Sequence, residues 1–424
     1  MTSPHTNVTI NLHEGDEDMC RLIELLDEIV DVRGSCGKRH SLLHILVMSV
    51  CAMLHGFNSF DDIYDYAKAH EAWLDGLLRL WNGIPCARTI NNVFRLVPPE
   101  AFLEAFMKWV NETIERALGC QIIIDGKAMR AAAEKATNGN TPYIVSAYLA
   151  DLGISIGQKR VDDKTNEITE IPKLLELLNI EGCIITIDAI GTQEKIMNQI
   201  KKQKGDFVLP LKENQRGTYA EVQAFFQEAI TEKDLVQILS NPLYEYISHY
   251  KSLNGEDFEV YVKREKAHGR KTNRIYIKTE STAWMTNQKF KHVNCLVMVI
   301  TLTTVNDNSA KYYVSSINLP CQELGKIIRK HWQIENNLHW VLDMYFYEDL
   351  SRIRKDNAME NMSLLRKLVY NIIKLDTRYD KINKNGNIIK LSTKRKINRY
   401  NLYPSEFEEL LFEFLPSLNR VDVK

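Results

Sequence analysis

The sequence of 424 residues predicts an α/β protein: a mixed sheet that carries a β-rich insertion and follows an all-helical N-terminal domain. Three observations support this fold class. Apolar residues recur at helical spacing through most of residues 1–118, short β-branched runs alternate with helical stretches through 119–216, and further strand-like runs fill 217–320. A chain of this length also exceeds one ordinary hydrophobic core, so two or three structural units are expected.

The N-terminal domain is expected to contain helices at 22–29 and 42–54, where apolar side chains recur at helical spacing. The connecting stretch 31–40 has two glycines and four basic or histidine side chains, so it could face phosphate or be an ordinary solvated connection. A short helix at 89–95 begins with polar residues and carries Arg95. Such a helix could enter a DNA groove, although most helices of this kind pack on a core.

The mixed sheet is expected to begin near residue 120. Three consecutive strands, with Gly153 in a tight turn, are followed by alternating helices and strands. This arrangement indicates the mixed sheet order of ribonuclease H. The expected strands are 122–125, 143–150, 154–161, 184–188 and 207–211, and the expected helices are 171–178, with Pro172 near its first turn, and 193–202.

The segment 217–320 is expected to be a β-rich insertion into this sheet. Residues 321–376 then regain helical spacing and are expected to complete the core. The segment 377–424 is expected to be a basic tail, because seven Lys or Arg stand against one acid between residues 379 and 400. The expected insertion strands are 258–264, 274–278, 295–302 and 312–317, after a helix at 219–230.

Bulk composition restricts the class of protein without choosing its partner. The chain is 45% hydrophobic and 26% charged, as is ordinary for a globular protein, and its net charge of −1 neither suggests nor excludes DNA binding. Eight scattered cysteines without a Cys-x-x-Cys pair argue against a zinc ribbon or a redox site and favour a reducing cytoplasm. The polar N-terminus is unlike a signal peptide, and the apolar run 42–54 is too short to span a bilayer. A soluble cytoplasmic protein without membrane contact is therefore expected.

Two aspartates stand at the ends of apolar strands: Asp125 follows 122–124, and Asp188 follows 184–187. If these strands are neighbours, the carboxylates converge at one sheet edge, where open α/β sheets bind ligands. Crowded carboxylates repel each other unless cations neutralise them, and Mg²⁺ prefers oxygen ligands. Taken singly, each aspartate could instead be structural, because Asp-Gly is a common turn dipeptide and aspartate often caps a helix.

A third acid is expected on the helix at 331–340. Glu335 lies at the edge of its apolar face, and His331, Glu335 and His339 are spaced four apart, which could form a metal-binding face or a solvated stripe. Three carboxylates from two strands and a helix are the layout for holding a pair of divalent ions in phosphoryl transfer on DNA. The acids that compete with Glu335 for this role are Asp343, Glu348, Asp349 and Glu360.

Several segments, in this order, resemble the insertion-sequence transposases of the H-repeat-associated branch. These belong to the broad class of DDE transposases, which have a ribonuclease-H-like catalytic core. The likeness runs from about residue 25 to about residue 412 and is highly specific because the motifs are long and ordered. The segments that carry it are 124–127, 145–147, 166–172, 186–189, 211–215, 331–340 and 348–354.

The resemblance implies that Asp125, Asp188 and Glu335 are the catalytic and metal-binding triad. It implies Mg²⁺ or Mn²⁺ as the cofactor, as two ions, and cleavage of DNA strands at transposon ends followed by strand transfer. The implied partners are double-stranded DNA (terminal inverted repeats and target) and a second copy of the chain, as a homodimer on DNA, with the helical domain binding the DNA ends. A domesticated DNA-binding protein without chemistry and a stand-alone nuclease of the same fold are the alternatives.

One departure from the family pattern concerns how the flanking strand is held. The wider class often has Tyr and Arg before the glutamate and Lys after it, whereas His331 and Leu342 occupy the Arg and Lys positions here. Arg329 and Lys330 could supply phosphate contacts instead. The other candidates could equally be exposed residues that only aid solubility. The candidate DNA contacts are Lys127, Lys212, Asn214, Arg270, His331, Arg352, Arg354, Lys394, Arg395 and Lys396.

Overall fold

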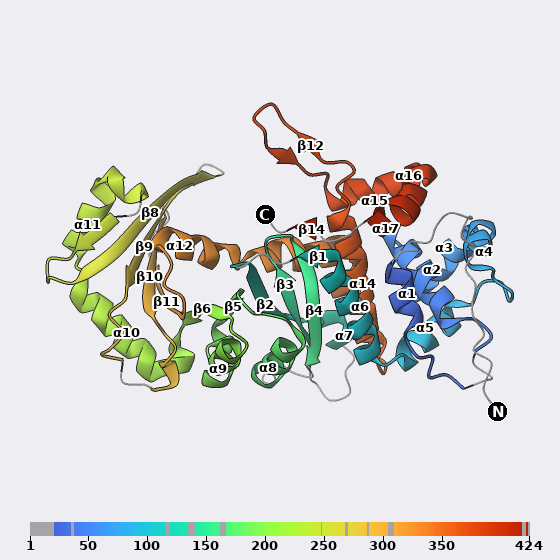
Figure 1. The fold of residues 1–424 in the computed structure, drawn as a ribbon, viewed down its shortest axis with the longest axis horizontal. Coiled ribbons are helices and arrows are strands. Elements are labelled where there is room, and N and C mark those ends of the chain that lie inside the picture. Colours follow the sequence, from blue (N-terminus) through green and yellow to red (C-terminus); the bar gives the residue numbers. More distant parts are fainter. Residues whose placement is uncertain are drawn as a thin grey trace.

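The computed structural model of the chain describes residues 21–34, 38–115, 119–133, 141–161, 167–246, 248–267, 270–285, 288–303, 309–417 and 421–422. Figure 1 shows an elongated molecule, with the N-terminal helices at one end, the β-rich segment at the other and the remaining strands between them. Among the described residues, none of the helices combines the length and apolar character that a membrane span requires.

The helical N-terminal region is confirmed. Its longest buried helix, α2, has every residue buried, which explains why the apolar run 42–54 lacks a polar face. Ser59 begins α3 with a capping box, since its hydroxyl accepts from the amide of Asp62 while the Asp62 carboxylate accepts from the Ser59 amide. The helices are α1 (Arg21–Asp27), α2 (Leu42–Leu54), α3 (Phe60–Ala69), α4 (Glu71–Leu78), α5 (Ala87–Leu96) and α6 (Pro99–Thr113).

A single ten-stranded sheet, in the order β4-β3-β2-β5-β6-β11-β10-β9-β8-β7, forms the centre of the fold. The strands β4, β3 and β2 are antiparallel, whereas β2, β5 and β6 are parallel to one another. The expected strands are therefore confirmed, and the sheet is mixed. Its strands are β2 (Gln121–Ala128), β3 (Tyr143–Leu149), β4 (Ile154–Val161), β5 (Ile184–Ile187), β6 (Asp206–Leu211), β7 (Ser248–Lys251), β8 (Asp257–Ala267), β9 (Arg270–Thr279), β10 (Cys295–Thr303) and β11 (Ser309–Ser315).

The β-rich segment extends the same sheet. Strand β11 pairs antiparallel with β6, so the segment adds five strands to the edge that β6 would otherwise expose. Its strands β7 to β10 then form an antiparallel meander. Two helices that connect β6 to β7, α10 (Arg216–Ala229) and α11 (Glu232–Ser240), accompany this part of the sheet, as Figure 1 shows in yellow-green.

Helix α8 (Glu167–Leu177) begins four residues earlier than the sequence predicts, and Pro172 lies inside it. The start at Glu167 places two acids in the first turn, where they interact favourably with the helix dipole. Pro172 is the sixth residue of this helix and lies beyond its first turn, so the missing N–H removes one backbone hydrogen bond from the helix interior. Helix α9 (Glu194–Lys202) agrees with the prediction.

The C-terminal part is helical as expected up to residue 375, but the segment from 377 folds into ordered elements rather than a tail. Its described residues form a two-stranded ribbon, three short α-helices, the π-helix η9 (Leu410–Phe414) and the strand β14 (Val421–Asp422), which pairs with β1 (Ile114–Glu115). The elements are α12 (Cys321–Lys330), the π-helix η7 (Ile334–His339), α13 (Trp340–Phe346), α14 (Ala358–Leu375), β12 (Lys381–Ile382), β13 (Ile388–Ile389), α15 (Thr393–Leu402), α16 (Pro404–Glu409) and α17 (Leu415–Ser417).

Helix α14 joins the sheet to the N-terminal helices. It contacts strand β4 and also the N-terminal helices α2, α5 and α6. Figure 1 shows α14 between the sheet and these helices. Two buried asparagines fix this position: Asn371 bonds both the amide and the carbonyl of Ser155 in β4, at 2.9 and 2.7 Å. Asn361 donates to the carbonyls of Phe94 and Val97. One hydrophobic cluster therefore runs through the helical region and the sheet.

Candidate active site

Asp125 and Asp188 lie side by side at one edge of the sheet. Strands β2 and β5 are parallel neighbours, with Ile124 paired to Ile187, so the next residue of each strand is at the same level. Neighbouring strands are about 4.8 Å apart, which places the two aspartate backbones within that distance of one another. The apolar residues before them are fully buried, so burial of these isoleucines sets the register that aligns the two acids.

Part of Asp188 is committed to local structure. Its Oδ1 accepts a hydrogen bond from the amide of Ile190 at 3.0 Å and caps the 3₁₀ helix Ala189–Gly191. Helix capping, the structural role that an aspartate at a strand end could have, is therefore observed for Asp188. A carboxylate has a second oxygen, so capping and ligand binding are compatible here.

Glu335 reaches the same edge from the π-helix η7. The exposed Glu335 lies near enough to Asp125 for its charge to act on that carboxyl. In the same short helix, Nδ1 of His339 lies 3.5 Å from Oδ2 of Asp125, and His331, which follows α12, has its Nδ1 3.1 Å from the Thr186 hydroxyl. Both histidines therefore contact the strands that precede the aspartates, while Glu335 between them is exposed. Single π-turns of this kind often occur at functional sites.

The electrostatics of Asp125 record this crowding of acids. Burial, as the largest cause, and the charges of Asp188, Glu335 and Glu167 together raise the pKa of the Asp125 carboxyl to about 7. His339 does not compensate, because burial lowers the pKa of its imidazole to about 3 and keeps it neutral. The site is thus an accumulation of negative charge without a matching cation among the groups that act on Asp125.

The competing acids of the C-terminal helices have other partners. Glu348 is buried, and although burial opposes its ionisation, Lys127, Lys367 and Arg366 lower its pKa to about 2. Asp343 also pairs with Lys127, and Asp349 lies 3.7 Å from Arg130. Glu335 is the member of this set whose charge acts on Asp125.

The donor chemistry fits a divalent metal. Asp125, Asp188 and Glu335 offer carboxylate oxygens, the ligands of hard cations, and the raised pKa of Asp125 shows that this position favours a neutralising proton or cation. In the described part of the chain, no three His, Cys, Asp or Glu side chains stand close enough to enclose one ion. These three acids would thus have to approach one another to share a metal.

Sequence reasoning missed Glu167. A side-chain carbon added at Gly126 would lie 2.4 Å from Oε1 of Glu167, so the glycine makes room for this buried carboxylate next to Asp125. The Asp125-Gly126 dipeptide is not a turn, because β2 continues to Ala128. Glycine inside a strand is a known mark of close approach, and this was the available signal.

Two candidate DNA contacts have structural roles instead. Lys127 is nearly buried, and its ammonium donates to Asp343 and, at 2.8 Å, to Glu348. This ion pairing leaves little of Lys127 to hold phosphate. The prediction for Lys396 is wrong: its side chain is buried and its ammonium donates to the carbonyls of Ile373 and Asp376.

Other candidates lie around the acids. Lys212 and Asn214 are exposed and line a cavity of about 580 Å³ that also contains Asp188. The Asn214 amide donates to the carbonyl of Ala189 at 2.6 Å, which ties this loop to the end of β5. Burial lowers the pKa of His331 to about 4, so this imidazole is neutral and cannot replace an arginine as a cation.

The remaining candidates are dispersed. Arg352 and Arg354 are exposed after α13, and Lys394 and Arg395 are exposed in the first turn of α15. Arg270 begins β9, while the adjoining turn residues 268 and 269 lie outside the described residues. Lys330 pairs with Asp151.

In the two N-terminal segments that could contact DNA, 31–40 and 89–95, some side chains bond other parts of the protein instead of facing outward. Arg33 is buried and bonds Asp31 and the carbonyl of His40, so it does not face outward. Arg95 on α5 bonds Asp356 at 2.7 Å, and α5 packs against α14. Lys38 and Arg39 are exposed, whereas residues 35–37 lie outside the described part.

Two family descriptions match adjacent parts of the chain. The family described as "Transposase DDE domain" matches residues 116–372, and "DDE_Tnp_1-associated" matches residues 23–110. "Putative transposase YncI" of Escherichia coli O157:H7 is 34% identical over 83% of this chain and 87% of its own. "H repeat-associated putative transposase YhhI" of Escherichia coli strain K12 is 32% identical over 85% of this chain and 92% of its own.

One solved structure has a weak likeness, the piggyBac transposase in a synaptic complex with hairpin DNA. It aligns with a TM-score of 0.42 and 10% identity, over 94% of this chain and 77% of that chain, and it supports no argument about this protein. The family match extends through both aspartates and Glu335, and two relatives above 30% identity are covered over most of their length. The chain therefore belongs to the DDE transposase family, among relatives that include H repeat-associated proteins.

Proposed function

We propose that this protein is an active DDE transposase that cuts DNA strands at the ends of an insertion sequence and joins them to target DNA. The observation that carries the proposal is that Asp125 and Asp188 end two adjacent parallel strands, while Glu335, on a π-helix, lies near enough for its charge to act on Asp125. The order β4-β3-β2-β5-β6, antiparallel and then parallel, supports a ribonuclease-H-like core as the fold that presents these acids.

Asp125, Asp188 and Glu335 would hold two Mg²⁺ or Mn²⁺ ions. Bound there, such ions supply an activated water and stabilise the leaving oxygen of a phosphodiester. The protein's own contribution is positional: the strand register fixes the two aspartates, and His339 packs against Asp125. Asp125 must release its proton to act as a ligand, and because its pKa is raised to about 7, metal binding near neutral pH would displace a proton from it.

The proposed substrate is double-stranded DNA with terminal inverted repeats, together with target DNA. Lys212, which lines the cavity beside Asp188, and the exposed Arg352 and Arg354 are the candidates for phosphate contacts. A pair of chains, one for each transposon end, is the proposed assembly, and the N-terminal helices with Lys38 and Arg39 are the proposed region for binding the ends.

The test is cleavage of a duplex that carries the cognate terminal repeat, with Mg²⁺ or Mn²⁺ and with a chelator. Wild type should cut only with metal, and Asp125→Asn, Asp188→Asn and Glu335→Gln should each lower the rate by at least about 10³-fold. The matched control is Glu323→Gln, an exposed acid on α12, which should retain activity. Equal cleavage by wild type and the triad variants would refute the assignment.

Product analysis separates the alternatives. Strands joined to target DNA identify a transposase, and free ends alone identify a nuclease of the same fold. Specific binding without metal-dependent cleavage identifies a domesticated DNA-binding protein. The preserved acids at all three positions favour the first outcome.

A further inference from the structure

A two-stranded ribbon projects from the body of the molecule beside the C-terminal helices. It consists of β12 and β13 and the turn between them, residues 381–389, and Figure 1 shows it standing clear of the other elements. Ile382 pairs with Ile388 across the ribbon, and their exposed fractions are 76% and 63%; that of Ile389 is 56%. Isoleucines exposed together on a projecting element are a feature of binding surfaces.

The ribbon is preformed by its own turn. The side-chain oxygen of Asn383 accepts from the amides of Asn385 and Asn387, at 2.9 and 2.8 Å, and the Asn383 amide donates to the carbonyl of Asn387. Gly386 has a φ of +77°, a left-handed conformation that glycine adopts without strain. A two-stranded ribbon alone is only marginally stable in water, so this turn keeps the isoleucine pair presented without a supporting core.

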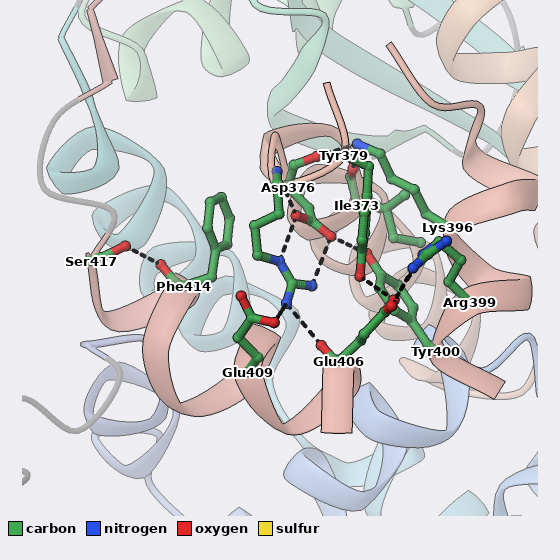
Figure 2. A network of polar contacts seen from close by, with 11 residues as sticks. Ile373, Asp376, Tyr379, Lys396, Arg399, Tyr400, Glu406, Glu409, Phe414 and Ser417 are labelled. Atoms are coloured by element: carbon green, nitrogen blue, oxygen red, sulfur yellow. Dashed lines mark hydrogen bonds and ion pairs between the residues drawn. The ribbon is translucent and has the colours of Figure 1, made fainter. Parts of the chain in front are cut away.

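The base of the ribbon is held by a network of polar contacts, shown in Figure 2. Before the ribbon, the buried Asp376 carboxylate accepts from Arg378 at 2.9 Å and from the Tyr400 hydroxyl at 2.7 Å. After the ribbon in the chain, the buried Lys396 donates to the carbonyls of Ile373 and Asp376. The segments before and after the ribbon are thus bonded to each other through the end of α14 and through α15.

The second half of this network locks α15 to α16. Glu406 accepts from Arg399 and, at 2.8 Å, from the Tyr379 hydroxyl, and Arg399 lies over the Tyr379 ring at 4.6 Å. Residues on both sides of the ribbon therefore belong to one rigid base. A preorganised element loses less conformational entropy when it binds a partner.

The charge of this region selects the partner. Residues 381–395 contain five Lys or Arg and no acid, although the whole chain has a net charge of −1. All five cations are exposed, and within the described residues none of them has an ion-pair partner. A polyanion is therefore complementary to this surface, whereas a second copy of a slightly acidic chain is not. The five cations are Lys381, Lys384, Lys390, Lys394 and Arg395.

We propose that the ribbon enters a groove of duplex DNA, with the Ile382–Ile388 pair against the bases and the surrounding lysines on the flanking phosphates. This inference rests on the proposed function, because it assigns a further contact to the same DNA substrate. The major groove is the expected location, since it admits a two-stranded ribbon without deformation and offers thymine methyl groups to apolar side chains. Phosphate contacts by the lysines position the ribbon along the duplex.

The experiment measures binding of the full-length protein to a 50-base-pair duplex with a terminal repeat, in a chelator and over a range of salt. The variant Ile382→Ser/Ile388→Ser should bind roughly tenfold more weakly with an unchanged salt dependence. The variant Lys381→Ser/Lys384→Ser/Lys390→Ser should lose about 0.9 of the slope of log affinity against log salt for each phosphate contact removed.

The matched control is Val236→Ser/Leu243→Ser, which removes two side chains of similar exposure (66% and 65%) from the β-rich segment and should bind like wild type. Because all the altered residues are exposed, every variant should keep the thermal midpoint of wild type. Wild-type affinity and salt slope in both ribbon variants would overturn the proposal. Loss of self-association in sedimentation, with DNA binding intact, would show that the ribbon is a protein–protein contact.

The two proposals fail separately. If wild type binds no duplex in the chelator, the proposed DNA substrate is wrong and the ribbon assignment falls with it. If wild type binds duplex and cuts it with Mg²⁺, and the ribbon variants have the same affinity and salt dependence as wild type, only the ribbon assignment is wrong. Methylation interference at guanine N7, lost in the isoleucine variant, would place the contact in the major groove.

Discussion

At the scale of single residues, two buried acids near the site have pKa values that are shifted in opposite directions. Glu348 receives Lys127 and is surrounded by further cations, so its pKa is lowered to about 2. Asp125 is also largely buried but has acids as neighbours, so its pKa is raised to about 7. The neutralised acid is structural, whereas the uncompensated acid is where a cation is expected to bind.

Asp125→Asn should stabilise the metal-free protein at high pH. The pKa of Asp125 is raised from 3.8 to about 7 on folding, so its contribution to stability is complete below pH 3.8 and is lost as the pH rises to about 7. The variant should therefore gain on the order of 2–4 kcal/mol at pH 8 and nothing near pH 4. Urea unfolding in a chelator measures this, with Glu323→Gln as the control. A gain that is equal at both pH values would contradict the electrostatic explanation.

Lys127→Met should destabilise the protein by about 3 kcal/mol, because it leaves the buried Glu348 carboxylate with one fewer cation. Lys127→Met/Glu348→Gln should recover part of this loss, since the second change removes the uncompensated charge. Equilibrium unfolding in urea provides the comparison. If the single variant kept full stability but bound DNA more weakly, Lys127 would be a phosphate contact after all.

At the scale of elements, strand register and a π-helix set the positions of the three acids. The parallel pairing of β2 with β5 aligns Asp125 with Asp188, and the π-helix η7 presents Glu335 and His339 to the same edge. Behind these strands, α14 is held to β4 by side chains that complete the backbone hydrogen bonding of an edge strand. The position of the sheet edge therefore depends on α14.

Asn371→Ala should cost about 2–4 kcal/mol of folding free energy. The change leaves the buried amide and carbonyl of Ser155 without their partner, and each unsatisfied group costs about 1–3 kcal/mol. Hydrogen exchange should show the Ser155 amide losing protection. Asn82→Ala, which removes an exposed side-chain bond to the Arg39 carbonyl, is the control and should change stability little.

At the scale of the whole molecule, the N-terminal helices and the sheet share one hydrophobic cluster. Helix α14 lies between them, and nearly all of its residues are buried. Two of these are Asn371, which bonds Ser155 of β4, and Asn361, which bonds the carbonyl of Phe94 in α5. The boundaries 1–118, 119–216, 217–320, 321–376 and 377–424 stay a prediction of organisation along the chain. The packing indicates that the first and second of these segments stabilise each other.

A fragment that begins at Gln121 should therefore not fold cooperatively, because it exposes the apolar face that α14 buries against α2, α5 and α6. Thermal unfolding followed by near- and far-ultraviolet circular dichroism tests this expectation. Replacing the ribbon 381–389 by a short glycine linker in the full chain is the control, and a single sharp transition should remain. A cooperative transition in the fragment would show that the sheet folds without the N-terminal helices.

Local pattern was sufficient for the strands, most helices and the two aspartates. The isoleucine runs before Asp125 and Asp188 must be buried as strands, and the first polar residue after each run must come at the strand end, whatever the rest of the fold. Glu335 was also named, through the motif at 331–340, but helical spacing alone left Asp343, Glu348, Asp349 and Glu360 equally possible. Glu335 is separated from these four acids by the effect of its charge on the pKa of Asp125.

The amino-acid sequence by itself thus determined the secondary structure and the identity of the strand-end acids, because both follow from short-range periodicity and side-chain polarity. Tertiary structure alone decided that Lys127 donates to a buried carboxylate and Lys396 to backbone carbonyls. It also decided that the Glu167 carboxylate lies against Gly126, and that the β-rich segment extends the central sheet. These outcomes depend on pairings between residues far apart in the chain and on the loss of water around charged groups, which no local pattern records.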